Sequence, residues 1–212
     1  MTLGAKLDAW PELYLADWVE TMETLHRFTQ VVGKVRLARA LPQNHWWQVP
    51  LYVSARGLTT SPIPDGDRVF EIAFDFLEHQ LRIEASDGAH AAFALRPMAV
   101  ADFHDAVMVL LRGMGIEVTI NPTTCEIPGE TLGLDRDRVH ATYDPEYVRR
   151  FHQALVSTSE VMARLRGEFL GKASPIHFFW GSFDLALTFF SGPALRRAPG
   201  RTGSPARPIH MR

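Results

Sequence analysis

The stretch from Ser174 to Asp184 sets groups that could do chemistry among large aromatic side chains. It holds the imidazole of His177, the hydroxyl of Ser182 and the carboxylate of Asp184, together with three phenylalanines and Trp180. Buried polar groups are costly unless they are paired. Their partners must therefore come either from the rest of the fold or from a ligand.

Arg36 raises the same question, because it falls in the apolar arc of an N-terminal helical pattern. A guanidinium in such a place needs a planar anion. One interpretation is that Arg36 recognises the carboxylate or phosphate of a ligand. The other is that it pairs with an internal acid such as Asp184, or that the helix has already ended there.

Three histidines from separate segments are candidate acid–base groups: His26, His45 and His177. Asn44 and Trp46 flank His45 at the entry to a predicted strand. Polar groups beside aromatic walls are typical of a small-ligand pocket, although aromatic residues are equally typical of a packed core. The close His spacings of metal sites are absent, so we expect no metal.

Arg56 precedes the hydroxyl-rich segment Thr59–Ser61. That combination could hold a phosphate, but it lacks the glycine-rich cradle and lysine of a P-loop, and a Ser/Thr-rich turn is the simpler interpretation. Cys125 has no neighbour in sequence that would activate its thiol, so we expect no role for it. The sequence specifies no reaction, substrate, cofactor or oligomeric state.

Apolar periodicity predicts three helices, over 12–37, about 100–114, and from Pro145 to a C-cap at Gly171. Asp144 is the expected N-cap of the last helix. The first helix places Glu20, Glu23, Arg27 and Lys34 opposite its apolar face. The last carries an apolar stripe that ends at Met162, Leu165 and Phe169.

Alternation of apolar and polar residues predicts strands over 47–55 and 70–76, around 81–83 and around 91–93, with a short strand at 118–121 and further strand structure over 176–190. A tight turn at Glu78-His79 would set Phe76 opposite Leu81 and Phe74 opposite Ile83. Gly88 would close the next turn and bring Phe93 and Ala91 beside Leu81 and Ile83. Residues 59–67 and 122–140 read as loops, and 176–190 as a hairpin or a strand bent at Gly181.

These elements predict an α+β fold, a mainly antiparallel sheet (a meander plus the C-terminal hairpin or bent strand) with two long amphipathic helices packed on one face. Residues 1–191 would form a single domain. Residues 192–212 hold five arginines and no acid, which leaves a charge of −7 for the body when the net charge is −2. We expect this basic tail to be disordered.

Composition narrows the class of protein. An acidic body makes nucleic acid an unlikely partner. No stretch approaches 18 uninterrupted apolar residues, so we expect no membrane span. With one cysteine and no visible signal peptide, we expect a cytoplasmic protein.

Several of these segments resemble a bacterial family known only as domain of unknown function 5996. The matching pieces span residues 10–191 and include Thr24-Leu25-His26, Asn44–Trp47, Arg56–Ser61, Tyr143–Pro145 and His177–Ala186. The resemblance implies no activity. It does imply that the polar members of these segments share one site: His26, Lys34, Arg36, Asn44, His45, Arg56, Lys172, His177 and Asp184.

The chain departs from the family at its end. Phe189 stands where a basic residue is usual, and family members continue with ordered sequence where this chain enters Pro193 and the Arg/Pro/Gly run. The resemblance therefore implies a C-terminally truncated member, with an exposed apolar strand near 185–190.

Two functions remain open. The first is a small-molecule-binding or enzymatic domain for an anionic ligand, with Arg36 and Arg56 for the anion, Trp46 and Trp180 as walls, and Asn44 nearby. The second is a non-catalytic structural or interaction domain in which every polar group is satisfied internally. Convergence of the predicted site residues around one hollow distinguishes the first from the second.

Overall fold

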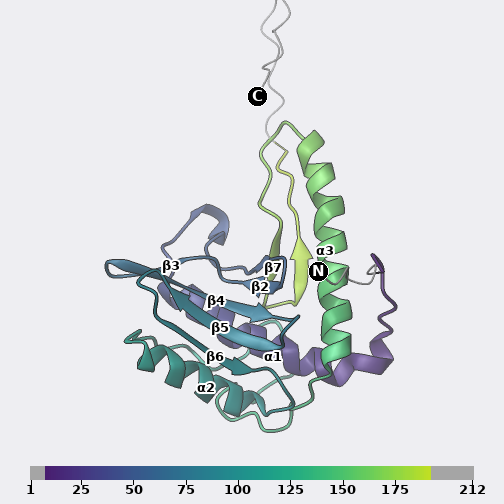
Figure 1. Ribbon diagram of the computed structural model, residues 1–212. Coiled ribbons are helices and arrows are strands. Elements are labelled where there is room, and N and C mark those ends of the chain that lie inside the picture. Colours follow the sequence, from purple (N-terminus) through teal and green to yellow (C-terminus); the bar gives the residue numbers. More distant parts are fainter. Residues whose placement is uncertain (1–7, 192–212) are drawn as a thin grey trace, which may run out of the picture.

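The computed structural model describes residues 8–191, and the predicted tail, 192–212, lies outside them. Its main sheet is antiparallel, with strand order β1-β2-β4-β5-β6 and β3 paired to β4 (Figure 1). The strands run β1 Tyr52–Val53, β2 Gly57–Thr59, β3 Ile63–Asp65, β4 Arg68–Asp75, β5 Gln80–Ala85 and β6 His90–Ala94. The helices run α1 Leu15–Arg39, α2 Val100–Gly113 and α3 Pro145–Glu168, and a 3₁₀ turn covers Asn44–Trp46. The α+β class is confirmed.

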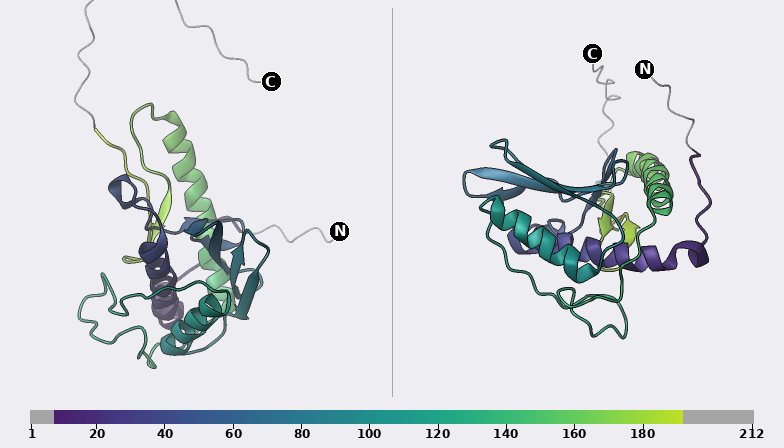
Figure 2. Two further views of the ribbon diagram at one scale, coloured as in Figure 1. Left: turned by 90° about the vertical axis from the view of Figure 1, so that its left-hand side faces the viewer. Right: turned by 60° about the horizontal axis from the view of Figure 1, so that its bottom comes forward.

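One face of the meander builds the core. Phe70, Ile72 and Phe74 of β4 are buried with Leu81 and Ile83 of β5. The helices α1 and α2 lie side by side beneath this face (Figure 2, right). Phe103 of α2 joins the layers, because its ring stacks on Phe28 of α1 at 3.9 Å between centroids and on Phe74 at 6.2 Å.

The register is part confirmed and part corrected. Leu81 pairs with Phe93 and Ile83 with Ala91, as the turn at Gly88 predicts. The preceding turn is longer than expected, so that Phe74, rather than Phe76, faces Leu81. The cause is Asp75, whose carboxylate accepts hydrogen bonds from the amides of Leu77 (3.1 Å) and Glu78 (2.9 Å) and starts the turn early.

The central helix α1 is covered on all sides for three turns. Every residue from Thr24 to Arg36 is buried except His26, which is half-buried. The predicted solvent face is therefore wrong for Arg27 and Lys34, which are 4% and 8% exposed. The long segment after α2 and the C-terminal hairpin cover the side that the sheet leaves open.

That hairpin consists of β7, His177–Phe179, and β8, Asp184–Ala186, as predicted, with a turn at Trp180–Phe183. Phe178 and Leu51 exchange backbone hydrogen bonds of 2.8 and 2.9 Å, which tie the hairpin to the loop before β1. Phe151 of α3 packs on Phe178 and stacks on Phe183 at 5.1 Å.

The helix α3 stands at the end of the sheet instead of on its face, and its far half projects from the body (Figure 1). Asp144 caps it through the amides of Glu146 and Tyr147, as predicted. The helix ends at Glu168 with Phe169 as C-cap, so Gly171 lies beyond it. The apolar stripe is buried only as far as Leu155, and Leu165 is 55% exposed, because no sheet or helix of the body reaches that turn.

Other boundaries also differ from the sequence analysis. The predicted strand 47–55 is reduced to Tyr52–Val53, since the chain forms a 3₁₀ turn before it. The predicted loop 59–67 contains the end of β2 and all of β3, where Pro64 is tolerated because β3 pairs on one side only. Residues 118–121 form no strand, and 122–140 is irregular as expected. No helix within 8–191 has the length and apolarity of a membrane span.

Candidate functional site

The hairpin turn packs on the side of α1 that the sheet leaves open and defines the candidate site. Trp180 is 5% exposed and donates its indole N–H to the carbonyl of Val49 at 2.9 Å. Its ring lies directly against Gly33, where an added Cβ would fall 2.3 Å from the ring atoms. We call the contact between α1, the loop 43–52 and this hairpin the α1–hairpin seam.

Arg36 lies in the seam as a buried cation. Its Nε donates to the carbonyl of Gln48 at 2.6 Å, and its guanidinium lies 5.4 Å from the centre of the Tyr52 ring. Nη1 is buried and has no hydrogen-bond partner within residues 8–191. Burial lowers the pKa of Arg36, opposed by the charges of Tyr52 and Glu71.

His177, like Arg36, lies next to the ring of Tyr52. It is 1% exposed, and the centres of the His177 and Tyr52 rings are 6.5 Å apart. Its Nδ1 is buried and, like Arg36 Nη1, unpartnered in the described part of the chain. Burial lowers the pKa of His177, against a smaller opposing effect of Asp184. The ring is therefore neutral at pH 7, with one nitrogen free for a partner.

Neither Arg36 nor Lys34 takes part in an ion pair among residues 8–191. Lys34 is 8% exposed, and its amine lies 5.6 Å from the centre of the Trp180 ring. Burial lowers the pKa of Lys34. Two buried cations on one helix thus lack acids, which is rare because an unpaired buried charge is expensive.

His26 is satisfied within the fold. Its Nε2 lies 2.8 Å from the carbonyl of Gly181, which requires the Nε2–H tautomer, and its ring packs on Phe183. The neighbouring Gln30 donates to the carbonyl of Cys125 at 2.8 Å and accepts from the amide of Cys125 at 3.0 Å. Burial lowers the pKa of His26, and the Gly181 carbonyl only partly offsets this.

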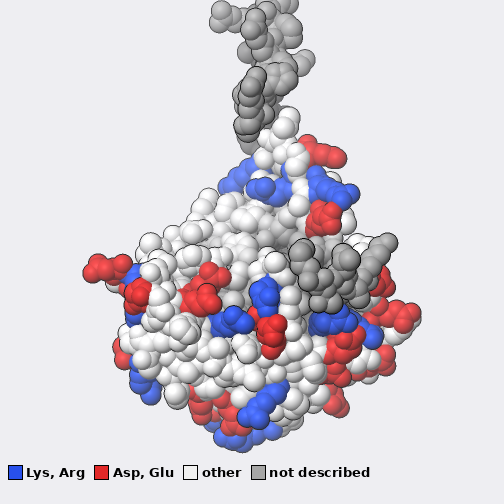
Figure 3. Space-filling view, viewed as in Figure 1, with Lys and Arg blue, Asp and Glu red and all other residues white. Residues whose placement is uncertain are grey.

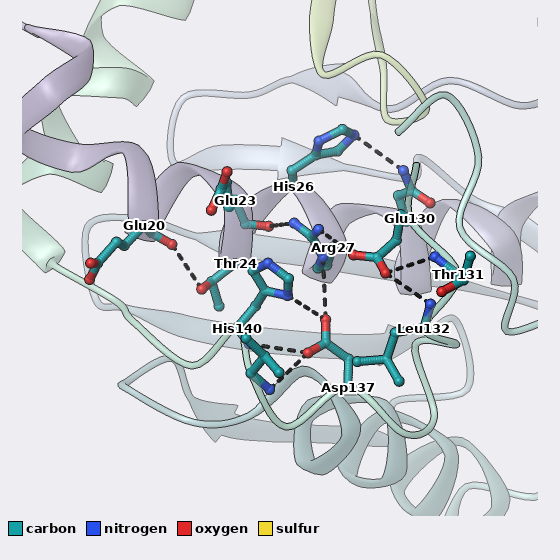
Figure 4. Close-up of polar contacts among 12 residues, drawn as sticks. Glu20, Glu23, Thr24, His26, Arg27, Glu130, Thr131, Leu132, Asp137 and His140 are labelled. Carbon is teal, nitrogen blue, oxygen red and sulfur yellow. Dashed lines mark hydrogen bonds and ion pairs between the residues drawn. The ribbon is translucent and has the colours of Figure 1, made fainter. Parts of the chain in front are cut away.

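Sequence reasoning missed a buried ion cluster below the seam (Figure 4). Arg27 ion-pairs with Glu130 at 2.8 Å and Asp137 at 3.3 Å, and its Nη1 donates to the carbonyl of Glu23. Asp137 also accepts from His140 Nδ1 at 2.7 Å. These contacts fasten the long loop 116–144 to α1. Each charge in the cluster has a partner of opposite charge within it, so we assign the cluster a role in stabilising the fold. The acids Glu130 and Asp137 in an otherwise irregular stretch were its only sequence signal.

The remaining predicted residues lie around the seam or outside it. His45 Nε2 accepts from Lys172 at 2.7 Å, and His45 packs on Phe190 at 4.8 Å. Asn44 and Trp46 are exposed on the same 3₁₀ turn. Asp184 is exposed and accepts from Ser182.

Arg56 is already paired. It lies in the β1–β2 turn and binds Asp75 at 2.6 Å, which holds the pKa of Asp75 below its usual range against the effect of burial. Arg56 lines a recess of about 280 Å³ on the sheet together with Glu71, Asp75 and Arg82. A groove of about 780 Å³ between α3 and the segment Asp8–Glu12 contains none of the predicted site residues. The surface between the sheet and the far end of α3 carries little charge on the face in Figure 3.

Fold and site together define an α+β protein whose central helix buries two basic side chains, Arg36 and Lys34, beneath a tryptophan-bearing hairpin, and neither forms an ion pair within residues 8–191. The profile of a family described as "Family of unknown function (DUF5996)" matches residues 10–211. The chain belongs to this family, which confirms the resemblance. The match includes the basic tail, and truncation stays a prediction. No curated protein and no solved structure matches the chain significantly.

Proposed function

We propose that the protein binds a small anion, a carboxylate or a phosphate, at Arg36 and His177 beside Tyr52. The observation that carries this proposal is the pair of buried, unpartnered nitrogens, Arg36 Nη1 and His177 Nδ1. Both belong to side chains next to the same tyrosine ring. No residue of the described chain supplies the acceptor that each lacks, and a bound ligand would.

The physical case rests on the cost of a buried charge. Taking a guanidinium out of water costs several kcal/mol unless an anion and full hydrogen bonding compensate. One neutral carbonyl bond to Gln48 leaves most of that cost in place. A ligand anion would form a charge-assisted bond with Arg36, and neutral His177 could donate an Nδ1–H to it. A reaction at this site, with His177 as proton carrier, is a further step that the binding proposal does not require.

A structural role is the second candidate, and specific contacts favour it. Nε2–H of His26 and the indole N–H of Trp180 both donate hydrogen bonds to backbone carbonyls, so these two groups need no ligand. If Arg36 had only a structural role, it would contribute to the stability of the fold through the packing of its methylene groups and its hydrogen bond to the Gln48 carbonyl. The two roles predict opposite effects of removing its charge.

The test is a thermal-shift and calorimetric screen of the full chain with inorganic phosphate, malonate and citrate. An anion at 100 times its Kd adds about 2.7 kcal/mol, which raises Tm by roughly 5–11 °C for a chain of this size. Arg36→Met should abolish the shift and, without ligand, leave the protein as stable or more stable. The control is Arg136→Met, since Arg136 is 72% exposed.

Two results would refute binding at this site. One is the absence of any anion-dependent shift across the screen, which would favour the structural role. The other is an equal shift in wild type and Arg36→Met. A loss of more than about 1 kcal/mol in ligand-free Arg36→Met would assign Arg36 to packing, since a lost hydrogen bond costs that much.

We also propose that the protein is bacterial and cytoplasmic and that nucleic acid is not its main partner. The acidic body argues against nucleic acid and the single cysteine supports the cytoplasm, whereas the bacterial origin rests on the family resemblance alone. The division into a domain over 1–191 and a basic tail over 192–212 likewise remains a proposal. Fractionation of the native cell would test the cytoplasmic location, and a nuclease-treated pull-down with the full chain would test the proposal on nucleic acid.

A further inference from the structure

Lys34 is unusual for this protein. The sequence has 22 basic side chains, and only three of them are lysines, at positions 6, 34 and 172. Lysine therefore occupies a buried helix position in a chain that otherwise uses arginine. The difference matters, because an arginine keeps its charge everywhere whereas a buried lysine can lose its proton and become a nucleophile.

The surroundings of Lys34 are held in place from two sides. On one side, Trp180 is fixed by its hydrogen bond to Val49 and its contact with Gly33. On the other, Gln30, one helical turn before Lys34, binds both backbone groups of Cys125, and Cys125 Sγ lies 3.7 Å from the same side-chain oxygen. The two residues that flank Lys34 are thus held by hydrogen bonds, as the walls of a reactive site must be.

Backbone strain points to the same place. Glu126, the residue after Cys125, has φ of +57°, a conformation that costs a non-glycine residue about 1 kcal/mol or more. This conformation brings its carboxylate over Gly181, where an added Cβ would lie only 3.1 Å from the carboxyl carbon. Such strain persists only where the surrounding structure enforces it, and it collects at functional sites.

We propose that Lys34 is a nucleophilic amine that condenses with a small carbonyl compound, an aldehyde or a ketone, in a site walled by Trp180 and Cys125. The neutral amine of Lys34 attacks the carbonyl carbon, and the resulting carbinolamine loses water. A C=N bond replaces C=O, and the two amine protons leave with the carbonyl oxygen as water. The step needs no oxidant or reductant, and it does not depend on anion binding at Arg36.

Burial, rather than the charges nearby, favours a neutral amine at Lys34. The titratable group that acts on Lys34 is Cys125 of the loop, and Cys125 and His26 of α1 are both influenced by Glu126. Burial raises the pKa of the Cys125 thiol, which favours the uncharged thiol, while the charge of a Cys125 thiolate would act against burial and raise the pKa of Lys34. Burial likewise lowers the pKa of His26, which keeps its ring neutral.

The experiment is reductive labelling of the full chain with glycolaldehyde or glyoxylate and cyanoborohydride at pH 7, followed by peptide mapping. Exposed Lys172 is the internal reference, which makes the result independent of any variant. Each unit of lowered pKa raises the neutral fraction of an amine about tenfold. We expect Lys34 to react several times faster than Lys172, with a pH–rate midpoint below that of Lys172.

Three further measurements complete the test. In 8 M urea the rates at Lys34 and Lys172 should become equal within about twofold, because the buried environment is lost. Lys34→Arg should abolish labelling at that position and leave Lys172 unchanged. Faster labelling with glyoxylate than with glycolaldehyde would assign the site to oxo acids, and the reverse to neutral carbonyls. Slower labelling of Lys34 than of Lys172 in the folded protein would overturn the proposal, as would equal pH midpoints.

Discussion

Gly33 offers the sharpest test of the α1–hairpin seam. Alanine is normally a better helix residue than glycine, by about 1 kcal/mol. At position 33, however, the added Cβ would fall 2.3 to 2.4 Å from three atoms of the Trp180 ring. A contact that short cannot be relieved by small adjustments, so either the hairpin turn or α1 must shift.

The size of the effect follows from three contributions. Forcing an extra methyl group into a packed contact costs about 1–3 kcal/mol. Displacing Trp180 breaks its bond to the Val49 carbonyl, and a buried group left unpaired costs about 1–3 kcal/mol more. The helix propensity of alanine returns about 1 kcal/mol. We therefore expect Gly33→Ala to lower the free energy of unfolding by about 1–5 kcal/mol.

Urea denaturation, followed by circular dichroism, measures this change directly. The matched control is Gly167→Ala in α3, where nothing lies within 4 Å of the added Cβ, and stability should stay the same or rise by up to about 1 kcal/mol. In a Trp180→Leu background, Gly33→Ala should cost much less than in wild type. Equal effects of the two glycine substitutions would refute the close contact of Trp180 with α1.

Two further predictions concern buried charge and protonation. Asp137→Asn removes a buried partner of Arg27, so it should lower the free energy of unfolding in urea by about 3–5 kcal/mol. Asp102→Asn removes one side of an exposed pair and should lower it by less than about 1 kcal/mol. Similar losses for both variants would contradict the stabilising role of the cluster. Burial lowers the pKa of His26 below its unfolded value of 6.5, so the folded state binds fewer protons and stability should fall as the pH drops through about 6.5. His26→Gln should reduce the dependence of stability on pH between about pH 7.5 and 5, and His90→Gln, on exposed β6, serves as the control. An unchanged pH dependence in His26→Gln would exclude His26 as its source.

Local patterns predicted much of the fold. The alternation in 70–76, 81–83 and 91–93, the glycine at 88 and the Asp144-Pro145 pair each specify structure through neighbouring residues, and the structure has the corresponding strands, turn and helix cap. The turn after Asp75 was misplaced, because a side chain bonding to its own backbone overrode the simple pattern. Strands β2 and β3 were missed because three-residue strands carry little periodic signal and owe their form to pairing with β4.

The sequence indicated only some residues of the candidate site, for a related reason. Arg36, His177 and Trp180 stood out because each is costly or large in an apolar segment. Gln30 did not, and Lys34 was grouped with the site only through the family resemblance, because helical periodicity assigns polar residues to a solvent face. A helix that is covered on all sides has no such face, and only the packing of distant segments reveals this.

The amino-acid sequence alone determined the α+β class, the main turns and caps, and the family, since these depend on spacing along the chain. The tertiary structure alone decided which side chains are buried without partners. That property depends on the loop 116–144 and the C-terminal hairpin closing over α1, and long-range closure leaves no periodic trace in the sequence. The chemistry proposed for Lys34 and Arg36 rests on this closure.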